Sequence, residues 1–337
     1  MNLDDLIQNE MEKQHIPGLS LAIVQQGEIT LAKGYGVANL ELHVPATPST
    51  VYQLASLTKQ FTATAIMLLL NEARLDLEAT IGHYLADTPA AWQEVTLRQL
   101  LTHSSGMMRD GTPTYWTTPA AMQQDYSYAQ MFQMIAQHPL DFAPGTKSSY
   151  SNSGYFLLGL VIEQITQQPL NTFFTARIFQ PLDMTATRIN DLRAIIPHRA
   201  TGYTWTEAGW QHPDYIGLTH HFANGGLVSN VLDLAKWDAA LYTEQILSQA
   251  HLQAMWTPAM HQDGTTSDYG FGWAISTHEG QRLVSHGGGL PGFSTYIARF
   301  VDAGLTVILL TNGHGLPSGT IAKSIAGFYL PAPTAVQ

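Results

Sequence analysis

The chain has 337 residues, of which 45% are hydrophobic and only 12% are charged, and its 15 basic and 26 acidic residues give a formal net charge of −11. This composition excludes a disordered chain, which needs low hydrophobicity and high charge density, and argues against a nucleic-acid partner, which needs clustered Lys and Arg. The absence of cysteine excludes a disulfide framework, a thiolate nucleophile and a Cys-ligated zinc site.

The N-terminal quarter predicts a short helix, a hairpin and a buried helix, in that order. Residues 2–14 are polar with apolar side chains at helical spacing, and a Pro-Gly pair then ends this segment. Leu19–Gln25 and Glu28–Tyr35 flank a Gln-Gly turn and predict a β-hairpin. Residues 57–75 are apolar on most of their helical circumference, so we expect a buried helix there.

The rest of the chain predicts helices first and strands afterwards. Helical segments are expected at Leu97–His103, Tyr128–Gln137, Ser153–Thr166 and Val231–Tyr242. Strands are expected at Tyr269–Thr277, Arg282–His286, Ser294–Phe300 and Thr306–Thr311, before a last helix at Pro317–Phe328.

Strands at both ends with helices between them predict an α/β (α+β) fold. An antiparallel sheet built from both chain ends would be flanked by helices, with a mainly helical region inserted in it. We expect residues 1–80 and 250–337 to form the sheet domain and residues 81–249 the helical region, with the active site between them.

The sequence predicts neither a membrane span nor a leader. Its first ten residues lack the basic start and apolar stretch of a signal peptide. The longest apolar runs, such as Ala65–Leu70 and Tyr155–Ile162, are far shorter than the ~20 residues that a span needs. The sequence as written favours a cytoplasmic location, or a periplasmic or secreted one if a leader was removed. It leaves the oligomeric state open.

The common signatures of metal, phosphate and nucleotide sites are absent from the sequence. There is no His-Glu-x-x-His helix, no Walker-type loop and no Gly-x-Ser-x-Gly elbow. Gly287-x-Gly289-x-x-Gly292 matches the dinucleotide fingerprint by letters, but Pro291 interrupts it and a strand-like segment follows where a helix should begin. The histidine pair at 220–221 has no carboxylate at ligand spacing and is better explained as a loop or a pocket wall. We expect neither a cofactor nor a metal.

Ser56-Leu57-Thr58-Lys59 begins the predicted buried helix. Positions i and i+3 share a helix face, so the Ser56 hydroxyl and the Lys59 amine can approach each other. Serine needs an adjacent base to act as a nucleophile, and a lysine in an apolar pocket loses its charge readily. A helix N-terminus also adds N–H donors near a developing oxyanion. The alternative is a serine N-cap with a solvated lysine, and these four residues alone favour it.

Two further segments change this interpretation: Tyr150-Ser151-Asn152 and His286-Gly287-Gly288-Gly289. The order and wide separation of Ser-x-x-Lys, Tyr-x-Asn and His-x-Gly resemble the serine β-lactamase and penicillin-binding-protein superfamily. The most similar branch is that of the class C β-lactamase-like hydrolases, with their related carboxylesterases, D-aminopeptidases and D-Ala-D-Ala carboxypeptidases. The resemblance covers most of residues 15–312 and includes Val51–Lys59, Leu100–Gly106 and Asn224–Ser229.

The resemblance implies a role for each matching position. Ser56 would be the acyl-forming nucleophile, and Lys59 would take its proton or lower its pKa. Tyr150 would act with Lys59 as general base and then protonate the leaving group, and the sequence leaves open which of the two accepts the proton. Asn152 would hold the lysine or the substrate amide. The backbone N–H groups of Ser56 and Gly289 would form the oxyanion hole.

The sequence differs from many β-lactamases at His286-Gly287-Gly288, the strand motif of this chain. Many β-lactamases have Lys-Thr-Gly where this chain has His286-Gly287-Gly288. Histidine has a reference pKa of ~6.5 and is mostly neutral at pH 7, and Gly287 removes a hydroxyl. We therefore expect His286 to be a site residue, and Gly287 and Gly288 to line the substrate, with weaker anchoring of a substrate carboxylate.

Two aromatic-rich segments are candidates for the pocket wall. They are Met107–Tyr128 and Tyr203–Phe222. The candidate substrate contacts are Tyr115 and Trp116 in the first segment and Phe222 in the second. Ordinary loop packing explains these residues equally well. If they do line the pocket, the acyl group is apolar, which favours an ester of short or medium chain.

The leading hypothesis is a serine hydrolase that acts through an acyl-enzyme on Ser56, as a carboxylesterase with weak or no β-lactam hydrolysis. The alternatives are a D-amino-acid peptidase or D-Ala-D-Ala carboxypeptidase, a true β-lactamase, and a non-catalytic ligand-binding protein on the same fold. The partner in each enzymatic case is a small ester, amide or peptide. No residue in the sequence identifies the base for deacylation.

Overall fold

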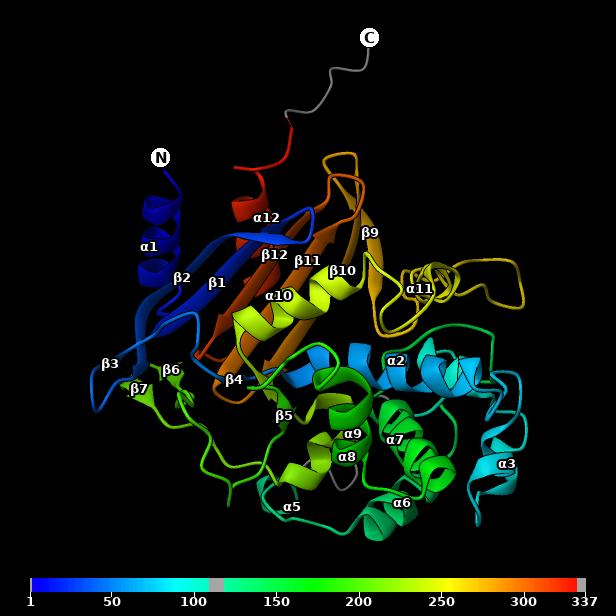
Figure 1. Cartoon of the computed structure of the whole chain (residues 1–337). Coiled ribbons are helices and arrows are strands. Elements are labelled where there is room, and N and C mark those ends of the chain that lie inside the picture. The colour runs from blue at the N-terminus through cyan, green and yellow to red at the C-terminus, as the bar shows by residue number, and fades with distance from the viewer. Residues whose placement is uncertain (1, 109–117, 332–337) are drawn as a thin grey trace.

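The computed structural model describes residues 2–108 and 118–331, and its main element is a seven-stranded antiparallel sheet (Figure 1). The strand order is β3-β2-β1-β12-β11-β10-β9. The strands are β1 (Gly18–Gln25), β2 (Glu28–Asn39), β3 (Val44–Pro45), β9 (Ala274–His278), β10 (Gln281–Leu290), β11 (Phe293–Phe300) and β12 (Leu305–Thr311). β1 pairs with β12 from Leu19↔Thr311 to Gln25↔Leu305. Both chain ends therefore build one sheet, which confirms the predicted fold class.

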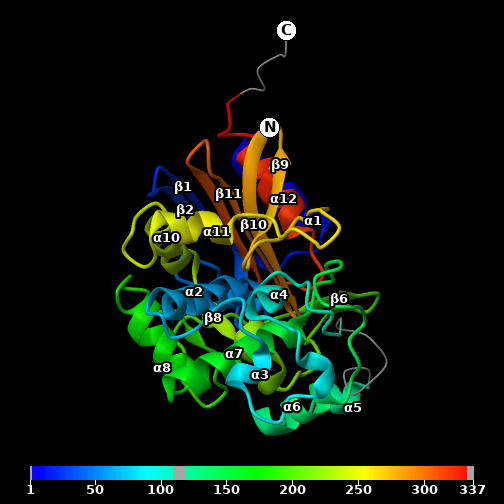
Figure 2. The same ribbon diagram turned by 90° about the vertical axis from the view of Figure 1, so that its right-hand side faces the viewer.

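Helices cover both faces of this sheet (Figures 1 and 2). They are α1 (Leu3–Lys13), α10 (Val231–Ala240) and α12 (Ser318–Ala326). Side chains of β1 alternate between the two faces: Leu21 and Ile23 join the core under α1 and α12, whereas Ala22 and Val24 join the core under α10. Because helices cover both faces of the sheet, side chains on both faces of β1 are buried, and its sequence is a nearly continuous apolar run.

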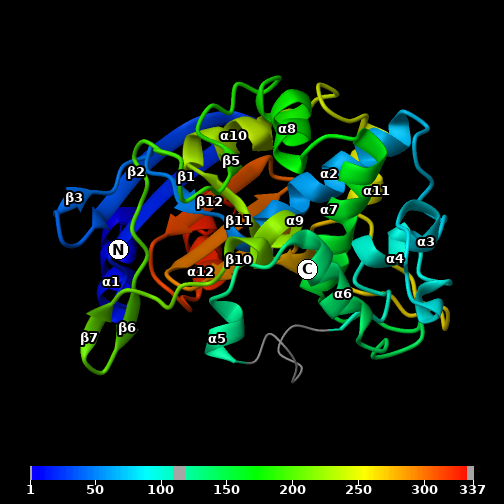
Figure 3. The same ribbon diagram turned by 90° about the horizontal axis from the view of Figure 1, so that it is seen from below.

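The remaining helices form a helical part at one end of the sheet (Figures 1 and 3), except α11 (Gln249–Met255), which lies beside the sheet at the level of α10 (Figures 1 and 2). The helices of the helical part are α2 (Thr58–Asn71), α3 (Ile81–Tyr84), α4 (Leu97–Leu101), α5 (Pro119–Met122), α6 (Tyr128–Ala136), α7 (Asn152–Thr166), α8 (Leu170–Phe174) and α9 (Phe222–Gly225). Short strands accompany them, namely β4 (Tyr52–Gln53), β5 (Arg188–Ile189), β6 (Thr204–Thr206), β7 (Gly209–Gln211) and β8 (Leu227–Ser229).

α2 is the buried centre of this helical part. All its residues from Thr58 to Leu69 are buried, and it packs against α7 and α9. The Gln60 amide oxygen accepts a hydrogen bond from the Trp237 indole of α10 at 3.0 Å. The predicted buried helix is confirmed, with its start at Thr58 after a short 3-10 turn.

The predicted strand Tyr269–Thr277 is wrong in its first half. The strand β9 begins only at Ala274. Gly272 has φ +77°, a left-handed conformation that interrupts an extended strand. The segment before β9 therefore turns toward α2 instead of continuing the sheet.

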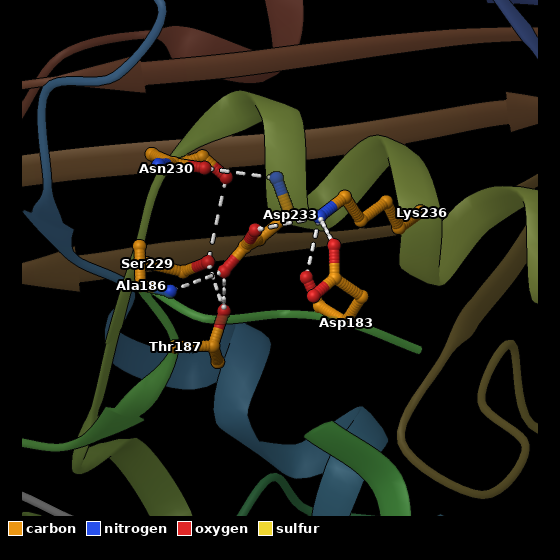
Figure 4. A network of polar contacts seen from close by, with 7 residues as sticks. All are labelled: Asp183, Ala186, Thr187, Ser229, Asn230, Asp233 and Lys236. Atoms are coloured by element: carbon orange, nitrogen blue, oxygen red, sulfur yellow. Dashed lines mark hydrogen bonds and ion pairs between the residues drawn. The ribbon is translucent and has the colours of Figure 1, made fainter. Parts of the chain in front are cut away.

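A polar network ties the start of α10 to the segment before β5 (Figure 4). The buried Asp233 carboxylate accepts hydrogen bonds from the Ala186 N–H at 2.8 Å and from the Thr187 hydroxyl at 2.9 Å. The Asn230 side chain caps α10 by accepting the Asp233 N–H at 2.8 Å. Lys236 adds an ion pair with Asp183 at 2.9 Å. The Thr187 hydroxyl also forms a hydrogen bond with the Ser229 hydroxyl at 2.7 Å, so the network includes β8, which lies directly before α10.

α10 lies on the sheet against β1 and β12 (Figure 1), although it belongs to the region expected to be helical and inserted. The division of the chain at residues 80 and 250 stays a prediction. Among the described residues, no helix is long and apolar enough to cross a bilayer.

Candidate active site

The predicted nucleophile lies on a strained turn directly before α2. Ala55–Leu57 form a 3-10 turn. Ala55 has φ +52°, a conformation that a residue with a Cβ rarely adopts. The turn leaves Ser56 partly exposed, whereas Lys59 is fully buried. The Lys59 Nζ lies 3.1 Å from the Ser56 Oγ, so the expected contact between positions i and i+3 is present.

Oxygen atoms of Ser56, Asn152 and Asn224 lie next to the Lys59 amine. Besides the Ser56 hydroxyl, the Nζ contacts the Asn152 Oδ1 at 2.5 Å and the main-chain carbonyl of Asn224 at 2.8 Å. It also lies 4.7 Å from the centre of the Tyr150 ring. All three oxygens belong to uncharged groups. Buried lysines are the ones that proteins use as general bases, so this environment suits the expected role of Lys59.

Tyr150 and Asn152 reach the site from the start of α7. Asn152 is the first residue of this helix, and Ser151 caps it by accepting the Gly154 N–H at 3.2 Å. The Tyr150 ring packs against the His103 ring at a centroid distance of 4.3 Å. The cap and the ring contact fix the directions of the two side chains, so the Ser-x-x-Lys and Tyr-x-Asn motifs meet at the Lys59 amine.

β10 contains three consecutive glycines, and the last two, Gly288 and Gly289, differ in what surrounds them. A Cβ at Gly288 would lie 2.3 Å from the Leu54 carbonyl oxygen, so only glycine allows this close approach. Thr295, opposite Gly288 on β11, donates to the same carbonyl at 2.8 Å. A Cβ at Gly289 would meet nothing within 4 Å, so Gly289 faces open space. The expected oxyanion donors on Ser56 and Gly289 thus lie on adjoining elements, and their role stays a prediction.

His286 is neutral and held in one tautomer. Its Nδ1 lies 2.6 Å from the Gly287 carbonyl oxygen, and its Nε2 lies 2.7 Å from the Tyr269 hydroxyl. A carbonyl oxygen only accepts, so Nδ1 carries the hydrogen and Nε2 accepts from Tyr269. Burial, and secondarily the charge of Lys59, lower the pKa of His286 to about 3. The strand motif therefore offers no cation at neutral pH.

Three groups at the site were not among the predicted site residues: the Tyr269 hydroxyl, the His103 ring and the Asn224 carbonyl. The His103 ring packs against both Tyr150 and Tyr269, with centroid distances of 4.3 and 4.5 Å. Burial, followed by the charge of Lys59, lowers the pKa of His103 well below its usual value. Two neutral histidines and two tyrosines thus form one contiguous wall beside the lysine.

The signal that could have located Tyr269 is the Tyr-Gly-Phe-Gly-Trp run at 269–273. A Cβ at Gly272 would lie 2.7 Å from the Lys59 carbonyl oxygen. Glycine within an apolar, strand-like segment often marks such a close backbone approach. The sequence does not say which backbone is approached, and here it is that of the catalytic lysine candidate.

The predicted pocket residues have different positions. Phe222 is 2% exposed and packs on the Tyr128 ring at 4.1 Å, and it also lines a cavity of about 80 Å³. Gly287 lies against the ring of a tyrosine on β11. Tyr115 and Trp116 lie outside the described residues. Substrate contact stays a prediction for all four.

Fold and site together define the class of protein. A serine next to a buried lysine, with a tyrosine and an asparagine at the same amine, provides a nucleophile, an adjacent base and groups that orient the base. The antiparallel sheet with its helical partner presents them at one place. This is a serine hydrolase of the β-lactamase and penicillin-binding-protein superfamily.

The chain belongs to the Beta-lactamase family, whose profile matches residues 3–326. It is 32% identical to penicillin-binding protein 4* of Bacillus subtilis (strain 168) over 332 residues, which cover 92% of this chain and 71% of that protein. It is 28% identical to Protein flp of Staphylococcus aureus (strain N315), of which it spans 62%, with 92% of this chain covered.

A solved structure with the same fold is that of D-amino acid amidase from Ochrobactrum anthropi SV3 complexed with D-phenylalanine. Its TM-score is 0.82 at 26% identity, and the match covers 97% of this chain and 98% of the amidase. The fold is thus shared over the whole length of a related hydrolase.

Proposed function

We propose that the protein is a carboxylesterase for short or medium acyl esters, with weak or no hydrolysis of β-lactams. The observation that carries this proposal is the neutral, buried His286. β-Lactams and D-Ala-D-Ala peptides carry a carboxylate on the leaving-group side, and a fixed cation would be needed to bind it tightly. His286 is 6% exposed and has a pKa of about 3, so it supplies no such cation.

The proposed reaction begins with attack of the Ser56 Oγ on the ester carbonyl carbon. A C–O bond forms, and the serine proton passes to Lys59 or Tyr150. The carbonyl oxygen becomes an oxyanion, which the N–H groups of Ser56 and Gly289 would bind. The tetrahedral intermediate then expels the alcohol, which takes its proton from Tyr150. Attack of water on the acyl-enzyme releases the acid and restores Ser56.

A second candidate is the hydrolysis of D-amino acid amides. The observation that favours it is the match over nearly the full length of a D-amino acid amidase. An amide nitrogen needs protonation to leave, and Tyr150 would supply that proton. The same serine would act in both reactions, so the two candidates differ only in the acyl and leaving groups that fit.

The test is one panel of substrates at pH 7.5: p-nitrophenyl butyrate, D-phenylalanine amide, a chromogenic cephalosporin and a D-Ala-D-Ala peptide. The proposal predicts that the ester has the highest kcat/KM and that Ser56→Ala abolishes its hydrolysis. A higher kcat/KM for the amide would establish the second candidate. Dominant turnover of the cephalosporin or peptide would overturn both.

A further inference from the structure

A cavity of about 470 Å³ is lined in part by residues that are close along the chain to Ser56 and Gly289. Gln53, three residues before the nucleophile, forms one wall, and Leu290, directly after Gly289, forms another. Leu218 adds an apolar side chain. The segments that carry the expected oxyanion donors, Ser56 and Gly289, thus both continue into the wall of this cavity.

The cavity contains one half-buried cation, Arg199. Its Nη2 donates to the Asn190 Oδ1 at 2.9 Å, and its Nη1 contacts the Asp191 main-chain carbonyl at 3.4 Å. Both partners are neutral oxygens, and within the described chain no carboxylate forms an ion pair with Arg199. Burial lowers the pKa of Arg199, but a guanidinium stays charged in proteins. The charge of the nearby Asp191 carboxylate raises the pKa of Arg199 against the effect of burial, but Asp191 is exposed and forms no ion pair with it. The remaining N–H groups of Arg199 are available for an anion.

The titratable residues that line the cavity do not pair with Arg199 either. Burial lowers the pKa of His221 to about 3, so it is neutral. His212 is exposed and pairs with Glu41 at 2.6 Å. Asp214 is exposed to solvent, where water and salt screen its charge. Arg199 is thus the cation that a bound substrate would meet away from bulk water.

We propose that this cavity takes the acyl part of the substrate and that Arg199 binds a carboxylate at its far end. The inference rests on the proposed esterase function and narrows its substrate class to half-esters of short dicarboxylic acids. An arginine binds a carboxylate through two parallel hydrogen bonds, and the apolar wall of Leu218 and Leu290 suits a methylene spacer. Charge recognition then lies on the acyl side, whereas the neutral His286 provides none on the leaving-group side.

The first test compares two esters that differ by one charge: mono-p-nitrophenyl glutarate and the same compound with its free carboxylate methylated. The wild type should have at least a tenfold lower KM for the charged ester, with similar kcat for both. Arg199→Gln should abolish the preference, and Arg199→Lys should retain part of it. Arg193→Gln is the matched control, because Arg193 is exposed and does not line the cavity. Equal KM values in the wild type would overturn the inference while leaving the esterase function intact.

The second test needs no turnover. Glutarate is titrated into the Ser56→Ala protein and into the Ser56→Ala, Arg199→Gln double variant, and binding is measured by calorimetry. We expect binding to the first protein that weakens as salt is added, and at least a tenfold loss in the second. Equal binding in the two proteins, or none in either, would overturn the inference. Glutarate binding without ester hydrolysis would refute the proposed function and leave the anion site in place.

Discussion

At the scale of single residues, the hydrogen bond from Tyr269 fixes the tautomer and the orientation of His286. The Tyr269 hydroxyl donates to the buried His286 Nε2 at 2.7 Å, and the Tyr269 ring also supports His103. Tyr269→Phe keeps the ring and removes the donor, which leaves a buried acceptor unsatisfied and costs about 1–3 kcal/mol of stability. We expect kcat for p-nitrophenyl butyrate to fall about tenfold as His286 loses its fixed orientation, which corresponds to about 1.4 kcal/mol.

The control for this variant is Tyr84→Phe on α3, which removes an exposed hydroxyl that accepts a hydrogen bond from the Asp76 N–H and contacts no site residue. The two variants should differ in kcat, measured at saturating ester. A Tyr269→Phe enzyme with unchanged kcat and KM would show that His286 needs no partner for catalysis.

Buried His286 also predicts how stability depends on pH. The pKa of His286 is about 3 in the folded protein, against ~6.5 for an unperturbed histidine in the unfolded chain. Between these values the unfolded chain binds a proton that the folded protein does not bind. Stability is therefore lost as the pH falls below 6.5, by about 1.4 kcal/mol per pH unit for this one group.

The measurement is urea unfolding of the wild type and of His286→Gln at pH 7 and pH 5. The wild type should lose on the order of 2 kcal/mol more than the variant between these two pH values. His103 adds to the loss in both proteins and cancels in the comparison. An equal loss in the two proteins would mean that His286 is protonated in the folded state.

At the scale of elements, the approach of the segment before β9 to α2 depends on Gly272. Gly272→Ala should destabilise the protein by on the order of 1–3 kcal/mol and lower kcat/KM, because its Cβ would lie 2.7 Å from the Lys59 carbonyl oxygen and push on the catalytic helix. Gly280→Ala is a close control, since Gly280 has φ +78° and a Cβ there meets nothing within 4 Å. Equal effects on activity would assign the loss to backbone strain alone.

The start of α10 depends on Asp233 in the network of Figure 4. The Asp233 side chain is 4% exposed, whereas that of Asp183, which pairs with the same Lys236, is 81% exposed. Asp233→Ala leaves the half-buried Ala186 N–H without its acceptor and the Thr187 hydroxyl with only its contact to Ser229, and should cost roughly 2–4 kcal/mol. Asp183→Ala should cost less than about 1 kcal/mol. Urea unfolding measures both, and similar losses would contradict the structure of this network.

At the scale of the whole molecule, the fold followed from hydrophobic patterning. β1 and β12 are apolar runs at opposite ends of the chain, and α2 is apolar around most of its circumference. Such patterns specify which segments are buried. They do not specify the left-handed φ values of Ala55 and Gly272, because those depend on contacts between segments that are distant in sequence.

The site could be predicted only in part, for a related reason. Ser56 and Lys59 are three residues apart, so helical spacing alone predicts their contact. Tyr150 and His286 could be predicted as site residues only from the resemblance to a family, because no local sequence pattern connects them to Ser56. Tyr269 was expected in a strand, and its hydrogen bond to His286 follows from a turn that the pattern did not predict. Arg199 belongs to no sequence motif, and its place in the cavity wall is known only from the structure.

The central claim is that Ser56 carries the acyl group during turnover. The most direct measurement is mass spectrometry of the protein quenched in acid within milliseconds of mixing with p-nitrophenyl butyrate, followed by peptide mapping. The account predicts a mass increase of one butyryl group on the peptide that contains Ser56, and no increase in Ser56→Ala. A butyryl group on another residue, or ester turnover by Ser56→Ala at the wild-type rate, would contradict the account.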